Sequence, residues 1–129
     1  MQKTLKNNIV QHNPTECTKS LPHVRDALHI LGGKWKLPIM FALGFGNKRF
    51  TEMLREIKGI TAKMLSKELK DLETNELVNR IVHNTRPVTV EYALSDYGMS
   101  LRKVLEELNS WGKKHRMKLI TQVNKEEAK

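Results

Sequence analysis

Residues 51–74, TEMLREIKGITAKMLSKELKDLET, decide the fold. They predict two short helices joined by a tight turn. Thr51 is expected to cap the first helix, because its hydroxyl can accept from the free N–H groups of the first turn. Residues 58–60 (KGI) break the apolar pattern, and Gly59 tolerates the positive φ that a sharp turn needs. Thr61 is expected to cap the second helix.

The second helix has two different sides at about 100° per residue. Its apolar stripe consists of Ala62, Leu65, Leu69 and Leu72, and the nearly opposite basic stripe consists of Lys63, Lys67 and Lys70. Two helices joined by a few residues that include a glycine form a helix-turn-helix, whose second helix can lie in the DNA major groove. For an isolated helix, a lysine face that is merely solvated is the simpler interpretation. The neighbouring segments favour a DNA-binding face instead.

The charge of the chain points to anionic partners. Lys and Arg number 23 against 14 Asp and Glu, so the net charge is +9, with a pI of 9.8. This balance favours nucleic acid, an anionic membrane surface or acidic proteins. No apolar run approaches the roughly 20 residues of a membrane span, and the N-terminus does not resemble a secretory signal, so no membrane partner is expected. A single cysteine excludes an intrachain disulfide and indicates a reducing cytoplasm.

The segments on either side supply further elements. Residues 1–20 are polar and irregular, and helical spacing predicts helices over 21–31 and 34–43. Pro38 is acceptable only if the second of these helices begins near Trp35 or Lys36. Residues 48–50 form a short strand before the helix-turn-helix. Residues 76–83 and 88–94 predict the two strands of a β-hairpin, and Ser95 is expected to cap the last helix.

This order predicts a mainly α fold with a small β-hairpin wing, a winged helix-turn-helix that dimerises through its N- and C-terminal helices. We expect a flexible N-terminal arm over 1–16 and a polar tail over 124–129. The winged helix-turn-helix domain, with its C-terminal dimerisation helix, is expected over 17–123. The hairpin would pack beside the recognition helix, so that its loop can reach the minor groove or the phosphate backbone.

Basic and small polar residues on this frame form the predicted double-stranded DNA-binding set. Phosphate contacts give affinity without sequence information, and base readout would fall to the first half of the recognition helix, from Thr61 to Lys67. The predicted DNA-binding residues are Arg49, Lys58, Thr61, Ala62, Lys63, Ser66, Lys67, Lys70 and Arg86.

The last helix carries a longer apolar stripe than a small domain needs to cover. Part of it is expected in the core, and its outer part is expected to form a dimer surface with the stripe of residues 21–31. A two-fold homodimer places two recognition helices about 34 Å apart, which matches a palindromic operator. The predicted interface residues are Leu21, Val24, Leu28, Leu101, Val104, Leu105, Leu108 and Trp111.

Cys17 has two interpretations. It is an inert thiol or small buried hydrophobe, or it is a sensor of oxidants or electrophiles. Glu16 and Lys19 have opposite effects on a thiolate, and the local sequence alone favours the inert interpretation. The cysteine and the histidines match no zinc-ligand spacing, so no metal and no cofactor are expected. No catalytic arrangement of side chains is visible either.

Several short motifs together resemble a known family. Residues 32–36 (GGKWK), 49–53 (RFTEM) and 60–65 (ITAKML) are similar to motifs of the HxlR-type winged helix-turn-helix transcriptional regulators. Residues 69–73, 90–92 and 95–98 and Trp111 extend the resemblance over roughly residues 17–112. The chain departs from the family at Thr18, where proline is frequent, at residues 75–77 (NEL), where Asn-Gly-Leu is usual, and at His83, where tyrosine is common.

The resemblance implies a bacterial or archaeal regulator that binds DNA as a homodimer, with repression as the usual mode. In this family the first and last helices form most of the dimer interface. Several members sense oxidants, quinones or aldehydes through a cysteine just before the first long helix, and Cys17 occupies that place. An intersubunit disulfide or an adduct at Cys17 would then change operator affinity.

Three hypotheses of function follow. The first is a dimeric, sequence-specific DNA-binding regulator, which is expected to prefer one operator. The alternative is a winged-helix module that acts mainly through protein–protein interaction, with weak nonspecific DNA binding. The third is an enzyme with Cys17 as nucleophile, for which the sequence offers no general base.

Overall fold

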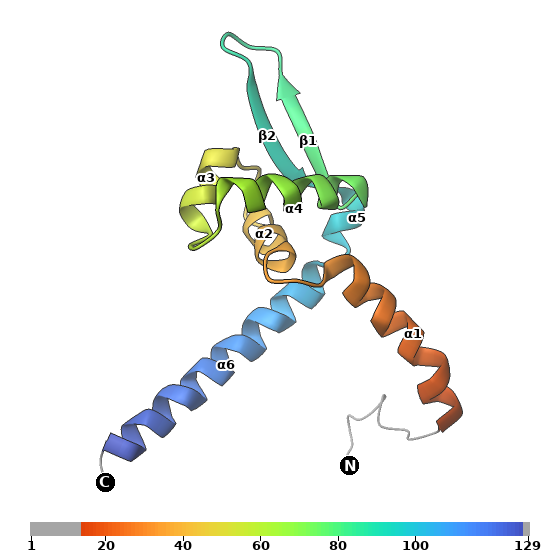
Figure 1. Ribbon diagram of the computed structural model, residues 1–129, viewed down its shortest axis with the longest axis vertical. Helices are drawn as coiled ribbons and strands as arrows, with labels where there is room; N and C mark the ends of the chain where they lie inside the picture. The colour runs from red at the N-terminus through yellow and green to blue at the C-terminus, as the bar shows by residue number, and fades with distance from the viewer. Residues whose placement is uncertain (1–13, 128–129) are drawn as a thin grey trace. The chain divides into compact units, whose positions relative to one another are not determined.

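The computed structural model describes residues 14–127 of the chain, which divides into two compact units, Met1–Gly33 and Lys34–Lys129. In the first unit the described residues form α1 (Pro14–Leu31). The second unit contains α2 (Lys36–Leu43), α3 (Phe50–Glu56), α4 (Ala62–Thr74), β1 (Val78–His83), β2 (Thr89–Leu94), α5 (Asp96–Met99) and α6 (Arg102–Glu127) (Figure 1). This order confirms the predicted mainly α fold with a hairpin wing.

The first helix begins earlier than its apolar spacing predicted. α1 starts at Pro14, because proline suits a first helical turn and the Thr18 hydroxyl donates to the Pro14 carbonyl oxygen at 2.9 Å. The last three residues of the expected 1–16 arm are therefore helical, and residues 1–13 lie outside the described part. Pro22 lies inside α1, where it removes one backbone hydrogen bond. None of the residues of α1 is buried within its unit.

The core of the second unit joins α2, α3 and α4 to the base of the hairpin. α2 begins at Lys36, as Pro38 required, so that this proline falls in the first turn. Each large apolar side chain removed from water contributes about 1.5–3 kcal/mol to folding. The fully buried side chains are Ile39, Met40, Met53, Leu65, Leu69, Leu72 and Val78.

The caps of the helix-turn-helix agree with the sequence at one helix and differ at the other. Thr61 caps α4 as predicted, because its hydroxyl oxygen accepts from the Met64 amide at 3.1 Å. The prediction that Thr51 caps α3 is wrong. α3 already begins at Phe50, and the free amide of Arg49 donates instead to Glu52 Oε1 at 2.8 Å. Gly59 has φ +91°, the positive angle predicted for the turn.

The end of α4 turns through a left-handed residue. Glu76 has φ +62°, its amide donates to the Glu73 carbonyl oxygen at 2.9 Å, and the Leu77 amide donates to the Leu72 carbonyl oxygen at 2.9 Å. This pair of bonds is the Schellman arrangement, in which the left-handed position is usually a glycine. The chain then enters β1 directly.

The wing is an antiparallel hairpin whose register runs from Val78 opposite Leu94 to His83 opposite Thr89. It projects away from the helices of its unit (Figure 1). The short strand predicted before the helix-turn-helix is a single bridge, in which Lys48 exchanges backbone hydrogen bonds of 3.0 and 2.8 Å with Tyr92.

Two predictions for the C-terminal part need correction. Ser95 does not cap the last helix. Its hydroxyl oxygen accepts from the Gly98 amide at 2.9 Å and caps the short α5, and α6 begins only at Arg102. α6 continues to Glu127, so the expected polar tail over 124–129 is helical as far as that residue. None of the helices in the described residues is long and apolar enough to cross a membrane.

Candidate DNA-binding surface

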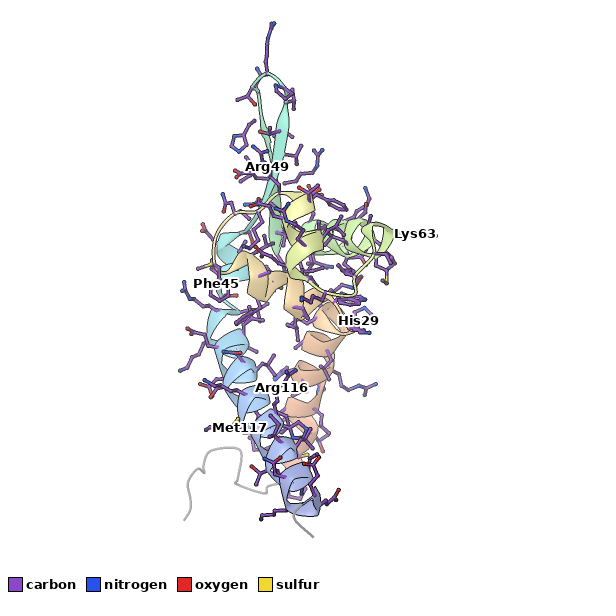
Figure 2. The ribbon with its side chains drawn as sticks, turned by 90° about the vertical axis from the view of Figure 1, so that its left-hand side faces the viewer. His29, Phe45, Arg49, Lys63, Arg116 and Met117 are labelled. Carbon is purple, nitrogen blue, oxygen red and sulfur yellow. The ribbon has the colours of Figure 1, made fainter. Side chains whose placement is uncertain are left out.

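The second helix of the helix-turn-helix, α4, presents one buried and one exposed side. Leu65, Leu69 and Leu72 are buried as predicted, and Ala62 is not. Ala62 is the first residue of α4 and is exposed, whereas the core covers the apolar stripe from Leu65 onward. The opposite side of α4 exposes Lys63, and Figure 2 shows this side chain at the outer end of the helix.

All nine side chains of the predicted DNA-binding set are exposed and lie in the second unit. They come from four places: the start of α3, the turn before α4, the exposed side of α4 and the loop of the wing. Arg49 immediately follows the residue that bridges to β2 and lies close to the strands in Figure 2. The fold thus brings basic side chains from separate segments onto one unit. The full set is Arg49, Lys58, Thr61, Ala62, Lys63, Ser66, Lys67, Lys70 and Arg86.

An ion pair joins α2 to α4, the second helix of the helix-turn-helix. Lys36 Nζ lies 3.0 Å from Glu68 Oε1 and 3.5 Å from Asp71 Oδ2. The side chains of Lys36 and Glu68 are only 14% and 11% exposed, so the charges are largely shielded from water. Sequence reasoning missed this pair. The signal was a glutamate adjoining the apolar stripe of α4, which requires a cationic partner when it is buried.

The lysines of the exposed side differ in their partners. Lys67 Nζ lies 3.2 Å from Asp71 Oδ2 and 3.6 Å from Glu68 Oε1. The hydrogen bond from Lys67 lowers the pKa of Asp71, and the same bond raises the pKa of Lys67. Within the described part of the chain, Lys63 and Lys70 have no such acidic partner. Their charge is therefore more available to an external anion than that of Lys67.

The wing loop holds its basic residue in the open. Arg86 is exposed, and the loop before β2 is fixed by a 2.8 Å hydrogen bond from the Thr85 hydroxyl to the Pro87 carbonyl oxygen. Below the loop, His83 Nε2 and Glu91 Oε1 lie 2.6 Å apart across the two strands. Arg86 is thus presented by a short, internally bonded loop.

Between α4 and the hairpin there is a polar hollow of about 340 Å³. Arg80 of β1 lines it together with Lys70 and Ser66 of α4. Sequence reasoning did not single out Arg80, although its place among the apolar residues of the strand at 76–83 marked it as solvent-facing. Arg80 and Lys70 give this hollow two cations at the junction of helix and wing.

The predicted interface residues divide into exposed and buried ones. Leu21, Val24 and Leu28 are about half exposed on α1, and Val104, Leu108 and Trp111 are similarly exposed on α6. Leu101 is half-buried. Leu105 differs from the prediction, because it is only 6% exposed and packs inside its own unit, where α6 contacts α2.

Cys17 carries a free, exposed thiol in α1. Because α1 already begins at Pro14, Cys17 lies on the same stripe as Leu21, Val24 and Leu28, at helical spacings of four, three and four residues. The interpretation of Cys17 as a buried hydrophobe does not hold within this unit. The described residues bring no three His, Cys, Asp or Glu side chains together at a metal site.

A helix-turn-helix with a basic second helix and a basic hairpin wing defines the winged-helix class of DNA-binding proteins. Comparison with known proteins agrees. The family model described as HxlR-like helix-turn-helix matches residues 30–119. The chain belongs to this family of transcriptional regulators, which are not enzymes.

Individual members of the family are similar to this chain in sequence and in structure. The HTH-type transcriptional regulator YtcD of Bacillus subtilis is 46% identical over 92 residues, which cover 71% of this chain and 73% of YtcD. Its crystal structure superposes with a TM-score of 0.68, covering 71% of this chain and 94% of that one. The redox regulator HypR in its oxidised form has a TM-score of 0.69 at 35% identity, covering 70% of this chain and 94% of HypR. The reduced form of YodB from B. subtilis has a TM-score of 0.64 at 40% identity, covering 70% and 88%.

Proposed function

We propose that this protein is a homodimeric, sequence-specific DNA-binding regulator that represses transcription from a palindromic operator. The observation that carries the proposal is the exposed side of α4, where Lys63, Ser66 and Lys70 stand opposite a buried leucine stripe. A helix anchored in this way can enter the major groove without disturbing its own core.

The contacts divide by chemistry. Thr61 caps α4, and Ala62, Lys63, Ser66 and Lys67 lie in its first half. These five side chains would read base edges. Ala62 is free to touch a thymine methyl group, because it is exposed. Arg49, Lys58, Lys70 and Arg86 would bind phosphates and set the register of the protein on the duplex.

The uncovered apolar stripes support the proposed dimer. The half-exposed leucines and valines of α1 and of α6 would leave large apolar surfaces in water if the chain were a monomer. Their burial between two copies would place two copies of α4 one helical turn of DNA apart. A protein that binds chromosomal DNA in a bacterium or archaeon would work in the cytoplasm.

Cys17 is proposed as the sensor. Its thiol is exposed and lies on the same stripe of α1 as the proposed dimer contacts, so a change at sulfur would act on the dimer. The related HypR is described as a redox regulator. If the Cys17 thiols of two protomers were joined, a two-electron oxidant would take up two electrons and two protons as the S–S bond formed. An electrophile would instead form an adduct.

The test is binding of the purified protein to DNA upstream of its own gene and to unrelated DNA. Both are measured at two salt concentrations, with and without the thiol oxidant diamide. We expect selective, salt-dependent binding that is lost on oxidation of the wild-type protein and retained in Cys17→Ser. Binding that oxidation leaves unchanged would remove Cys17 as the sensor. Equal, weak and salt-labile binding to both DNAs would overturn the regulator and favour the alternative of a module that acts through a protein partner.

A further inference from the structure

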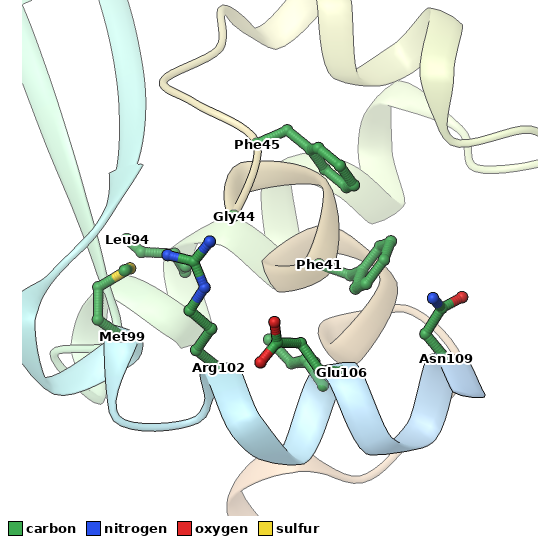
Figure 3. A pocket seen from close by; sticks show the side chains of 9 residues that line it. Phe41, Gly44, Phe45, Leu94, Met99, Arg102, Glu106 and Asn109 are labelled. Carbon is green, nitrogen blue, oxygen red and sulfur yellow. The ribbon is translucent and has the colours of Figure 1, made fainter. Parts of the chain in front are cut away.

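A cavity of about 380 Å³ opens between α2, α5 and α6 in the second unit (Figure 3), and none of the predicted DNA-binding residues lines it. Its walls are mostly apolar. Phe41 and Phe45 form one wall as an edge-to-face pair with ring centroids 5.2 Å apart. Leu94 and Met99 form another wall, and Leu105 also lines the cavity. Volume and composition are those of a site for a small organic molecule.

Three polar side chains of α6 border the same cavity. Arg102, Glu106 and Asn109 follow one another at spacings of four and three residues, so they share one side of the helix. Figure 3 shows the Arg102 and Glu106 side chains rising from α6 toward α2. Arg102 can only donate hydrogen bonds and an ionised Glu106 can only accept them, whereas Asn109 can do both.

We propose that this cavity binds a small, uncharged aromatic molecule that bears a hydroxyl group, that is, a phenol. The aromatic ring would pack against Phe41, Phe45 and the Met99 thioether. The hydroxyl would donate to Glu106 and accept from Arg102. A carboxylate on the ligand would be repelled by Glu106, and an ammonium group would be repelled by Arg102, so the pair of opposite charges selects a neutral polar group.

The site remains open in the proposed dimer. At about 100° per residue, Arg102, Glu106 and Asn109 lie on a different side of α6 from Val104, Leu108 and Trp111. The exposed Phe45, which is 76% accessible, lies at the mouth of the cavity rather than in the core. A ligand would contact α2, which supports the helix-turn-helix, and α6, which carries the proposed dimer stripe. A bound ligand would thereby link the helix-turn-helix to the proposed dimer surface.

The test uses the full chain labelled with ¹³C at its methionine methyl groups, with 2-naphthol as the probe. We expect the Met99 signal to shift saturably, while the signals of Met64 on α4 and Met117 on α6 stay in place. 2-Naphthoate and 2-naphthylmethylammonium, which have the same rings and opposite charges, should bind at least about tenfold more weakly. This measurement involves no DNA, so it stands or falls independently of the proposed function.

Two variants and a matched control locate the site. Phe45→Ala removes an exposed wall and Glu106→Gln removes the charge that accepts the hydroxyl, and each should weaken 2-naphthol binding about tenfold. Glu107→Gln makes the same charge change one residue away, outside the cavity, and should leave binding unchanged. A Met99 signal that does not move would overturn the site. Equal losses in Glu106→Gln and Glu107→Gln would do the same, and tighter binding of either charged probe would overturn the ligand class.

Discussion

The hydroxyl of Ser95 donates a 2.6 Å hydrogen bond to the carbonyl oxygen of Glu76, and the two residues lock the end of α4 to the start of α5. The same hydroxyl oxygen accepts from the Gly98 amide, and the Ser95 amide donates to the Leu77 carbonyl oxygen at 3.1 Å. A methyl group at Gly98 would collide with that carbonyl. These contacts hold Glu76 in a left-handed conformation that a glutamate rarely adopts.

Glu76→Gly should therefore stabilise the protein. The left-handed conformation costs a residue with a side chain about 1–2 kcal/mol, which glycine avoids. Glycine has more freedom in the unfolded chain, so folding costs it about 0.4–1 kcal/mol more in entropy. The expected net gain in the free energy of unfolding is roughly 0.5–1 kcal/mol. Urea denaturation at a fixed protein concentration measures it. Glu73→Gly, in the last turn of α4, is the matched control and should lose about 1 kcal/mol. A lower urea midpoint for Glu76→Gly than for the wild type would contradict the conclusion that the left-handed conformation of Glu76 is strained.

Removal of one partner of the Lys36–Glu68 pair should lower the free energy of unfolding more than removal of both. Lys36→Met leaves a largely buried carboxylate without its main counter-ion and should lower the free energy of unfolding by about 2–3 kcal/mol. The double variant Lys36→Met, Glu68→Met buries no unpaired charge and should recover most of that loss. Denaturation of both single variants and the double variant forms the cycle. Losses that simply add would show that the two side chains do not interact.

The sequence predicted the parts of the fold that repeat a local pattern. The leucine spacing of α4, the Gly59 turn and the β-branched strands of the wing are each visible within a few residues. Burial that depends on a distant element was missed. Leu105 lies on the predicted stripe of α6, but only its contact with α2 makes it core. The local sequence gives Glu68 the pattern of an ordinary surface charge, and only the fold places Lys36, 32 residues away, beside it.

The candidate site shows the same division. Exposure of the basic residues on α4 follows from helical spacing alone. Which of them are already paired does not, because Asp71 could point along the helix toward Lys67 or away from it. The position of Arg80 beside Lys70 needed the packing of β1 against α4, which no single segment specifies.

Asp71→Asn should strengthen DNA binding. It releases Lys67 from its 3.2 Å partner and removes a negative charge beside the proposed DNA surface. We expect about threefold tighter binding, and a salt slope steeper by up to about one because one more lysine becomes available. Fluorescence anisotropy with labelled DNA at several salt concentrations measures both. Asp96→Asn, in the first turn of α5, makes the same charge change at a carboxylate that does not pair with Lys67 and should have a smaller effect. Equal gains in the two variants would indicate a general charge effect.

Lys63 and Lys67 should differ in the same experiment. Lys63→Ala removes a cation that has no acidic partner among residues 14–127 and should reduce the salt slope by about one, with the fold intact. Lys67→Ala removes a charge that Asp71 and Glu68 already offset, so its slope should fall by less. Normal affinity in both variants would remove α4 as the recognition helix.

Substitutions at Trp111 and Leu105 should have different effects, the first on dimerisation and the second on stability. Trp111 is 67% exposed, and its ring stacks on the His115 ring with the two centroids 5.1 Å apart. Trp111→Ala should shift the mass in solution from dimer toward monomer. Leu105→Ala should instead lower the free energy of unfolding by about 2–4 kcal/mol, because it leaves a cavity in the core. Analytical ultracentrifugation and urea denaturation distinguish the two effects. Lys113→Ala, on another side of α6, is the control, and an unchanged dimer in Trp111→Ala would argue against this interface.

Arg86 in the wing should contribute affinity without sequence preference. Its side chain is exposed on a loop that the Thr85 hydroxyl bonds internally, so Arg86→Ala should leave the fold unchanged and weaken binding about three- to tenfold. The loss should be similar on operator and unrelated DNA, because phosphate contacts carry no base information. Arg116→Ala removes the same charge from α6 and should have little effect. The measurement is selection of bound sequences from a randomised duplex pool, with wild type and variant in parallel. An altered base preference in Arg86→Ala would show that the wing contacts bases in the minor groove, and that it does not contact the DNA phosphates alone.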